Sequence, residues 1–97
     1  MLYAILFKPT RSDLISTMTP DEEKLILEHY LYLKDLADKG KAKLVGRRED
    51  GEFGIAIVDY ASQSEAEAFH KNDAAVKAGI FDVSVGAFRL SLGGFSQ

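Results

Sequence analysis

The chain has 97 residues, a net charge of −3 at pH 7 and a sequence pI of about 5.3. This length suits a single domain over residues 1–97 with one core. A composition of 46% hydrophobic and 28% charged residues is that of a globular protein and excludes a disordered chain. No block of Lys and Arg provides the basic face that nucleic-acid binding needs, and the absence of cysteine excludes disulfides, thiolate metal ligands and a cysteine nucleophile.

The chain opens with a predicted strand. Residues 2–8 (LYAILFK) are a short apolar run rich in strand formers, and Pro9 ends it, whereas residues 9–18 are mostly polar and indicate a loop. The N-terminal segment is too short for a signal peptide, and its positive charge follows the apolar run instead of preceding it. No stretch approaches the roughly 20 apolar residues that span a bilayer. We therefore expect a soluble, cytoplasmic protein without membrane contact.

A long helix is predicted over residues 20–39. Thr19 and Glu22 have the spacing of a capping box, and Pro20 suits the first helical position. Gly40 is a natural helix terminator.

The middle of the chain predicts a hairpin followed by shorter helices. Residues 42–49 and 53–60 are strand candidates, joined at the turn signal Asp50–Gly51. A second helix is expected over residues 62–71, and a further helical turn over residues 72–79.

The last segment, residues 81–92, alternates between apolar and polar side chains, but its two halves are out of phase. A β-bulge near Gly86–Ala87 would restore one apolar face. The order βαββαβ predicts an α+β, ferredoxin-like fold, with a four-stranded antiparallel sheet and helices on one face. Residues 93–97 are expected to form a mobile tail.

The predicted sheet has a second face that the helices do not cover. Its first, third and fourth strands carry more apolar residues than one-sided burial explains. A chain of this size cannot cover both faces alone. We therefore expect two copies to associate sheet to sheet as a homodimer.

His29 is the first candidate for chemistry. Leu25 and Ile26 lie one helical turn before it, and Tyr32 and Leu33 one turn after it, so the imidazole belongs to the apolar stripe of the helix. Two interpretations are open. The ring is either a core histidine that bonds to a backbone carbonyl or a tyrosine hydroxyl, or a group placed for function.

Asp73 also has two interpretations. An aspartate that opens a helical turn is usually an N-cap, but its carboxylate could also orient an imidazole and stabilise its charged form. Spacing alone does not decide whether His29 and Asp73 meet. His70, beside Lys71 at the end of a helix, is expected in solvent and is assigned no role. Two histidines without an H-x-x-x-H or H-x-H spacing do not predict a metal site.

The sequence resembles the YCII-related (YciI-like) family of small bacterial proteins of the dimeric α/β-barrel type. The resemblance covers the opening MLYAILF, residues 29–46 (HYLYLKDLADKGKAKLVG) and residues 72–90 (NDAAVKAGIFDVSVGAFRL). In that family a histidine of the first helix precedes spaced leucines, and an Asp-Pro motif leads into the last strand. His29 and Asp73 fall on these positions. Ala74 stands where the family usually has proline. This difference leaves Asp73 in place, both as a helix cap and as a carboxylate.

The resemblance implies that His29 and Asp73 form the active site of a small cofactor-free enzyme. Such a pair without a serine or cysteine nucleophile suits general acid–base chemistry. The family suggests lyase or isomerase reactions on a small organic molecule, including dehydrochlorination of hydroxylated aromatics in some members. The alternative is a non-catalytic dimeric module that binds a small molecule or a protein, with His29 as a polar anchor. A cofactor-free monooxygenase is a third, by analogy of fold.

Overall fold

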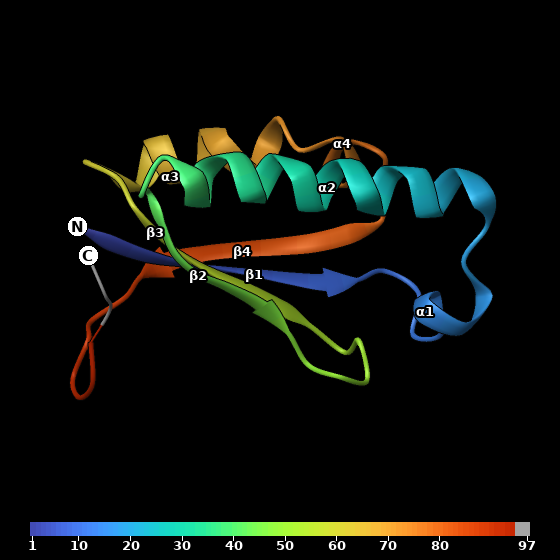
Figure 1. Cartoon of the computed structure of the whole chain (residues 1–97), viewed down its shortest axis with the longest axis horizontal. Coiled ribbons are helices and arrows are strands. Elements are labelled where there is room, and N and C mark those ends of the chain that lie inside the picture. Colours follow the sequence, from blue (N-terminus) through green and yellow to red (C-terminus); the bar gives the residue numbers. More distant parts are fainter. Residues whose placement is uncertain (95–97) are drawn as a thin grey trace.

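The computed structural model describes residues 1–94, so the end of the tail expected over residues 93–97 lies outside the described residues. It has a four-stranded antiparallel sheet with helices packed on one face (Figure 1), as predicted. The elements along the chain are β1 Leu2–Pro9, α1 Leu14–Thr17, α2 Pro20–Asp38, β2 Ala42–Arg47, β3 Gly54–Asp59, α3 Gln63–Lys71, α4 Ala74–Lys77 and β4 Phe81–Ala87.

The N-terminal strand lies inside the sheet, whose order is β2-β3-β1-β4. β1 pairs antiparallel with β3 on one side and with β4 on the other, so Ile5 lies beside both Ala56 and Val85. β2 and β4 are the edge strands. The pairing of β2 with β3 shifts register between Ala42 and Leu44, which is a β-bulge.

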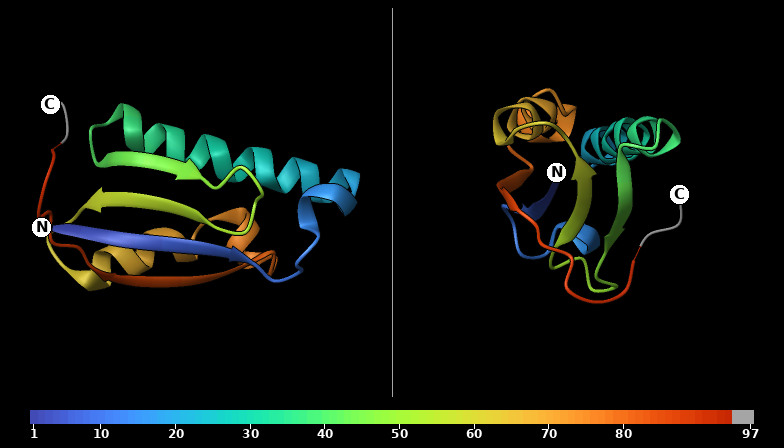
Figure 2. Two further views of the ribbon diagram at one scale, coloured as in Figure 1. Left: turned by 90° about the horizontal axis from the view of Figure 1, so that it is seen from below. Right: turned by 90° about the vertical axis from the view of Figure 1, so that its left-hand side faces the viewer.

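Side chains alternate between the two faces of each strand, and those on the face toward α2 and α3 form the core. Figure 2 shows these two helices side by side over the sheet, with α2 on the side of β2 and α3 on the side of β4. The buried cluster between the layers comprises Tyr3, Ile5, Phe7, Leu33, Leu36, Ala42, Ala56, Val58 and Ala66. Each large apolar side chain buried there stabilises the fold by about 1.5–3 kcal/mol. This packing fixes α2, and with it the candidate histidine, against the sheet.

The predicted start and end of the long helix are confirmed. The Thr19 hydroxyl accepts a hydrogen bond from the Glu22 N–H at 3.2 Å, and the Glu22 carboxylate accepts one from the Thr19 N–H at 2.9 Å. Pro20 occupies the first helical position. The helix ends at Asp38, and Gly40 follows with φ of 77°, a conformation that glycine adopts without strain.

Residues 9–18, predicted to be a loop, contain the short helix α1. Leu14 is the buried residue of this helix, and the Thr17 hydroxyl donates to the Asp13 carbonyl at 2.8 Å. A helix of four residues makes about one turn, which is too short for an apolar periodicity to appear in the sequence.

β4 ends at Ala87, so the predicted continuation through a bulge to Leu92 is wrong. The Phe88 N–H donates to the carbonyl of Leu2 at 2.9 Å. Because Leu2 is the first residue of β1, no partner strand remains beyond this bond. Residues 88–94 leave the sheet and turn below it (Figure 1).

The face of the sheet opposite the helices is apolar over three strands. By alternation it presents Leu2, Ala4, Leu6, Leu44, Ile55 and Ile57. Leu6 is 41% exposed and Leu44 is 46% exposed. β4 presents Asp82 and Ser84 on this face, so the part of the face that β4 forms is polar. The prediction that the fourth strand adds apolar residues to this face is wrong. We call the six apolar residues the open face.

Candidate active site

His29 lies on the side of α2 that packs on the sheet. Its ring contacts the rings of Phe7 and Phe81, with centroid separations of 4.8 and 4.9 Å. The side chain is 14% exposed. Phe7 belongs to the interior strand β1 and Phe81 to the edge strand β4, and their rings fix the orientation of the imidazole and shield most of it from water.

Asp73 begins α4 and reaches back toward α2. Its side chain is 0% exposed, and its Oδ1 accepts a hydrogen bond from the Ala75 N–H at 3.0 Å. Its Oδ2 is in hydrogen-bond contact with Nδ1 of His29. The carboxylate therefore caps α4 and also contacts the imidazole.

The contact has a consequence for the tautomer of the ring. A fully buried carboxylate remains ionised only when hydrogen-bond donors surround it. Asp73 has two such donors, the Ala75 N–H and the histidine. Ionised Asp73 requires the proton of a neutral His29 to lie on Nδ1, which leaves a lone pair on Nε2. Nε2 is thus the atom that can exchange a proton with another molecule.

Tyr32 lies one turn after His29 and ties α2 to α3. Its hydroxyl donates to the Phe69 carbonyl at 2.9 Å, and its ring stacks on that of Phe69 at 4.4 Å. Burial is the main cause that raises the pKa of Tyr32. The tyrosine therefore ties α2 to the end of α3, from which the chain continues to Asp73. Sequence reasoning missed this tie because its partners are 37 residues apart.

His70 is less exposed than the sequence predicted. Its Nδ1 is buried and has no hydrogen-bond partner among the described residues. Burial and then the positive charge of Lys71 lower the pKa of His70. Among the described hydrogen bonds, none joins the His70 ring to the side chains of His29 or Asp73. The backbone carbonyl of His70 accepts a hydrogen bond from the Asp73 N–H at 3.1 Å.

Two cavities lie away from the pair. One, of about 510 Å³, is on the open side of the sheet and is lined by Leu6, Lys8 and Phe53 among others. The other, of about 270 Å³, lies at the start of β1 beside Asp59 and Tyr60. Neither is lined by the candidate histidine or its carboxylate. Within residues 1–94 no three His, Asp or Glu side chains gather in a way that could hold a metal ion. None of the helices in this range is long and apolar enough to cross a membrane.

The comparisons with known proteins agree with this architecture. No curated protein matches the chain. Among solved structures, the chain is similar to 5-chloro-2-hydroxyhydroquinone dehydrochlorinase from Burkholderia phenoliruptrix AC1100, solved in complex with 2,5-dihydroxybenzoquinone. The TM-score is 0.73 and the sequence identity 24%, over 94% of this chain and 96% of that chain, which shows a common fold. The family model of the YCII-related domain matches residues 1–89. The chain therefore belongs to the YCII-related family, as its sequence motifs predict.

Proposed function

We propose that the protein is a small cofactor-free enzyme of the lyase or isomerase type, in which His29 and Asp73 perform general acid–base chemistry on a small organic molecule. The observation that carries the proposal is the contact between an imidazole and a fully buried carboxylate. Capping alone would not require a histidine partner. Histidine is the side chain whose proton can be gained and lost near neutral pH, which makes this pair suited to proton transfer.

In the proposed mechanism, Nε2 of His29 takes a proton from the substrate. The ring becomes positively charged, and the ionised Asp73 beside Nδ1 stabilises that charge without accepting the proton itself. In an elimination, the electron pair of the broken bond forms a double bond as the leaving group departs as an anion. In an isomerisation, Nε2 returns the proton to another atom of the same molecule.

The similar dehydrochlorinase suggests the substrate class. That protein acts on a chlorinated, hydroxylated aromatic compound and was solved with a dihydroxybenzoquinone. We therefore propose small hydroxylated aromatics or quinones as ligands of this chain. Such planar molecules suit a site bordered by the aromatic rings of Phe7 and Phe81.

The test is chloride release from 5-chloro-2-hydroxyhydroquinone, together with a thermal shift assay with 2,5-dihydroxybenzoquinone. We expect His29→Gln to lower turnover by about 10²–10⁴-fold, the usual contribution of a general acid–base group. The matched control is His70→Gln, which should retain turnover. Equal turnover in His29→Gln and the parent protein would contradict the assignment.

The second candidate is a non-catalytic module that binds a small molecule with His29 as a polar anchor. The low exposure of His29 favours it, because an anchor can be enclosed whereas a catalytic group must reach its substrate. A melting temperature that rises with 2,5-dihydroxybenzoquinone, without chloride release or any other turnover, would select this candidate.

We also infer that a second copy of the chain covers the open face. Its residues lie side by side on three neighbouring strands, and Leu6 and Leu44 among them are exposed to water at 41% and 46%, which a second copy would bury. Two such faces are self-complementary in a two-fold dimer.

A further inference from the structure

The candidate pair is too enclosed to meet a substrate in the structure described here. The His29 side chain is 14% exposed, Asp73 is 0% exposed, and neither described cavity reaches them. A general acid or base must come within about 2.6–3.2 Å of the atom it protonates or deprotonates. If the proposed function is right, a part of the chain must move to admit the substrate.

The segment that connects β1 to α2 packs on residues that contact the two members of the pair. Its buried residue, Leu14, packs in a small cluster with Ala75 and Ile80, and Phe81 packs against this cluster. Phe81 in turn contacts the ring of His29, and the N–H of Ala75 bonds to the Asp73 carboxylate. The segment and α1 extend past the end of the sheet, below the start of α2 (Figure 1).

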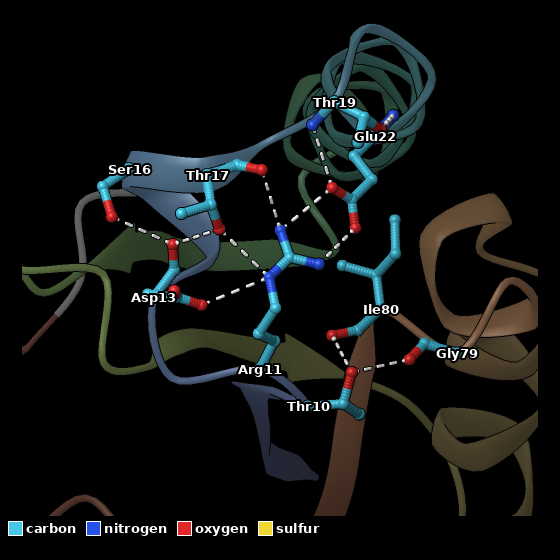
Figure 3. A network of polar contacts seen from close by, with 9 residues as sticks. All are labelled: Thr10, Arg11, Asp13, Ser16, Thr17, Thr19, Glu22, Gly79 and Ile80. Carbon is cyan, nitrogen blue, oxygen red and sulfur yellow. Dashed lines mark hydrogen bonds and ion pairs between the residues drawn. The ribbon is translucent and has the colours of Figure 1, made fainter.

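Arg11 fastens this segment to the first turn of α2. Its guanidinium donates to both carboxylate oxygens of Glu22, at 2.9 and 3.0 Å, and to the carbonyl of Thr17 at 3.2 Å (Figure 3). The hydrogen bond from Arg11 is the main cause that lowers the pKa of Glu22 to about 2. The pair is therefore charged at every pH near neutrality, so its opening does not depend on protonation of Glu22.

Two further contacts hold the segment. The Thr10 hydroxyl donates to the carbonyls of Gly79 and Ile80, at 2.8 and 3.1 Å (Figure 3). On the other side, Ile15 packs so tightly against Gly51 of the β2–β3 hairpin that a Cβ on this glycine would overlap the end of the isoleucine side chain. Thr10 thus fixes the start of the segment, while Ile15 rests on another part of the fold.

We propose that residues 11–18 form a strap that closes over the His29–Asp73 pair, with the Arg11–Glu22 ion pair as its latch and the contact of Ile15 with Gly51 as its second support. The strap is built to open more easily than the rest of the fold. One buried side chain anchors α1, and the latch is a partly exposed ion pair, which is a weak interaction. Opening lets a small molecule reach Nε2 of His29, as lids do in other enzymes.

The experiment measures access to His29 directly. Diethyl pyrocarbonate modifies unprotonated histidine nitrogens, and mass spectrometry gives the modification rate at His29, with His70 as an internal reference. Hydrogen exchange of residues 11–18 reports opening of the strap. Two variants loosen it: Arg11→Gln removes the latch, and Gly51→Ala displaces Ile15.

Each variant has a matched control. Lys34→Gln removes an exposed ion pair with Asp38 on the same helix α2, without touching the strap. Gly40→Ala introduces a Cβ at φ of 77°, nearly the 75° of Gly51, but no atom lies within 4 Å of that Cβ. This control separates backbone strain from displacement of Ile15.

We expect both loosening variants to raise the His29 modification rate by about three- to tenfold, the effect of losing one charge-assisted or packing contact, together with faster exchange in residues 11–18. Both controls should match the parent protein. Faster exchange of the strap without faster modification of His29 overturns the proposal, as does an unchanged His29 rate in both variants. So does a parent protein in which His29 reacts as fast as a free histidine peptide.

Neither readout uses turnover, so the two proposals fail separately. If His29→Gln keeps full chloride release but the strap variants expose the ring, the pair is a guarded binding site and the acid–base role is wrong. If His29→Gln abolishes turnover but the strap variants leave the ring unexposed, the acid–base role stands and the substrate enters elsewhere.

Discussion

Replacing Asp73 by asparagine separates the two roles of this side chain. Asparagine caps helices about as well as aspartate, so the bond from the Ala75 N–H at 3.0 Å is retained while the negative charge is lost. Removing a fully buried charge also removes its desolvation cost, which offsets the replacement of the charge-assisted bond to His29 by a neutral one. We therefore expect Asp73→Asn to change the unfolding free energy by no more than about 1 kcal/mol. Asp73→Ala, which also loses the cap, should cost about 1 kcal/mol more.

The chemical effect of the same change should be large. The side-chain N–H of asparagine donates to Nδ1 of His29, which moves the ring proton to Nε2 and removes the lone pair that takes the substrate proton. By analogy with aspartate-to-asparagine changes in hydrolase triads, turnover should fall by about 10³–10⁴-fold. The nitrogen NMR signals of the His29 ring should therefore report the proton on Nε2 in Asp73→Asn and on Nδ1 in the parent protein.

The control is Asp35→Asn, which removes an exposed carboxylate of α2 that pairs with Lys39. It should alter neither the His29 tautomer nor turnover. If Asp73→Asn leaves the His29 tautomer and chloride release as in the parent protein, Asp73 is a helix cap alone. The reasoning from the buried contact is then refuted.

Three further predictions concern stability and assembly. Because the folded-state pKa of Glu22 is about 2, below its ordinary value of 4.5, its contribution to stability is present above pH 4.5 and is lost as pH falls toward 2. The difference in unfolding free energy between the parent protein and Glu22→Gln should therefore shrink over that range in acid-dependent denaturation curves. Leu6→Glu on the open face should convert a dimer into a monomer of 10.7 kDa in sedimentation, whereas Leu27→Glu, at a more exposed site on α2, should not. Tyr32→Phe should lower the unfolding free energy in urea by about 1 kcal/mol, because the part-buried Phe69 carbonyl keeps the Asn72 N–H but loses the tyrosine hydroxyl; an unchanged value would mean that water replaces the hydroxyl.

Features that depend on near neighbours in the sequence were predictable. Thr19, Pro20 and Glu22 lie within one turn, and Gly40 ends the helix through its own backbone, so both ends of α2 followed from local chemistry. The strand before Pro9 was equally clear. The end of β4 was not, because it depends on where β1 begins, and no pattern within the last strand carries that information.

In the candidate site, too, the features set by near neighbours in the sequence were predictable and the contacts between distant residues were not. Helical spacing placed His29 on the buried stripe of its helix, and the start of a helical turn identified Asp73 as a cap. Their contact spans 44 residues, and only the family motif pointed to it. The aromatic rings of Phe7 and Phe81 around the imidazole arise from strand register, which a single sequence does not give. The latch from Arg11 also depends on tertiary geometry.

The position of β1 inside the sheet has a consequence for biosynthesis. β1 leaves the ribosome before the other strands of the sheet, yet its two neighbours are β3 and β4, and Pro9 pairs with Phe81, which is made 72 residues later. At about 5–20 residues per second, the first strand waits on the order of 4–15 s for its last partner. Until then its apolar side chains have no complete sheet to join. A ribosome stalled before Phe81 should therefore carry a nascent chain without a protected β1, which chaperones can bind.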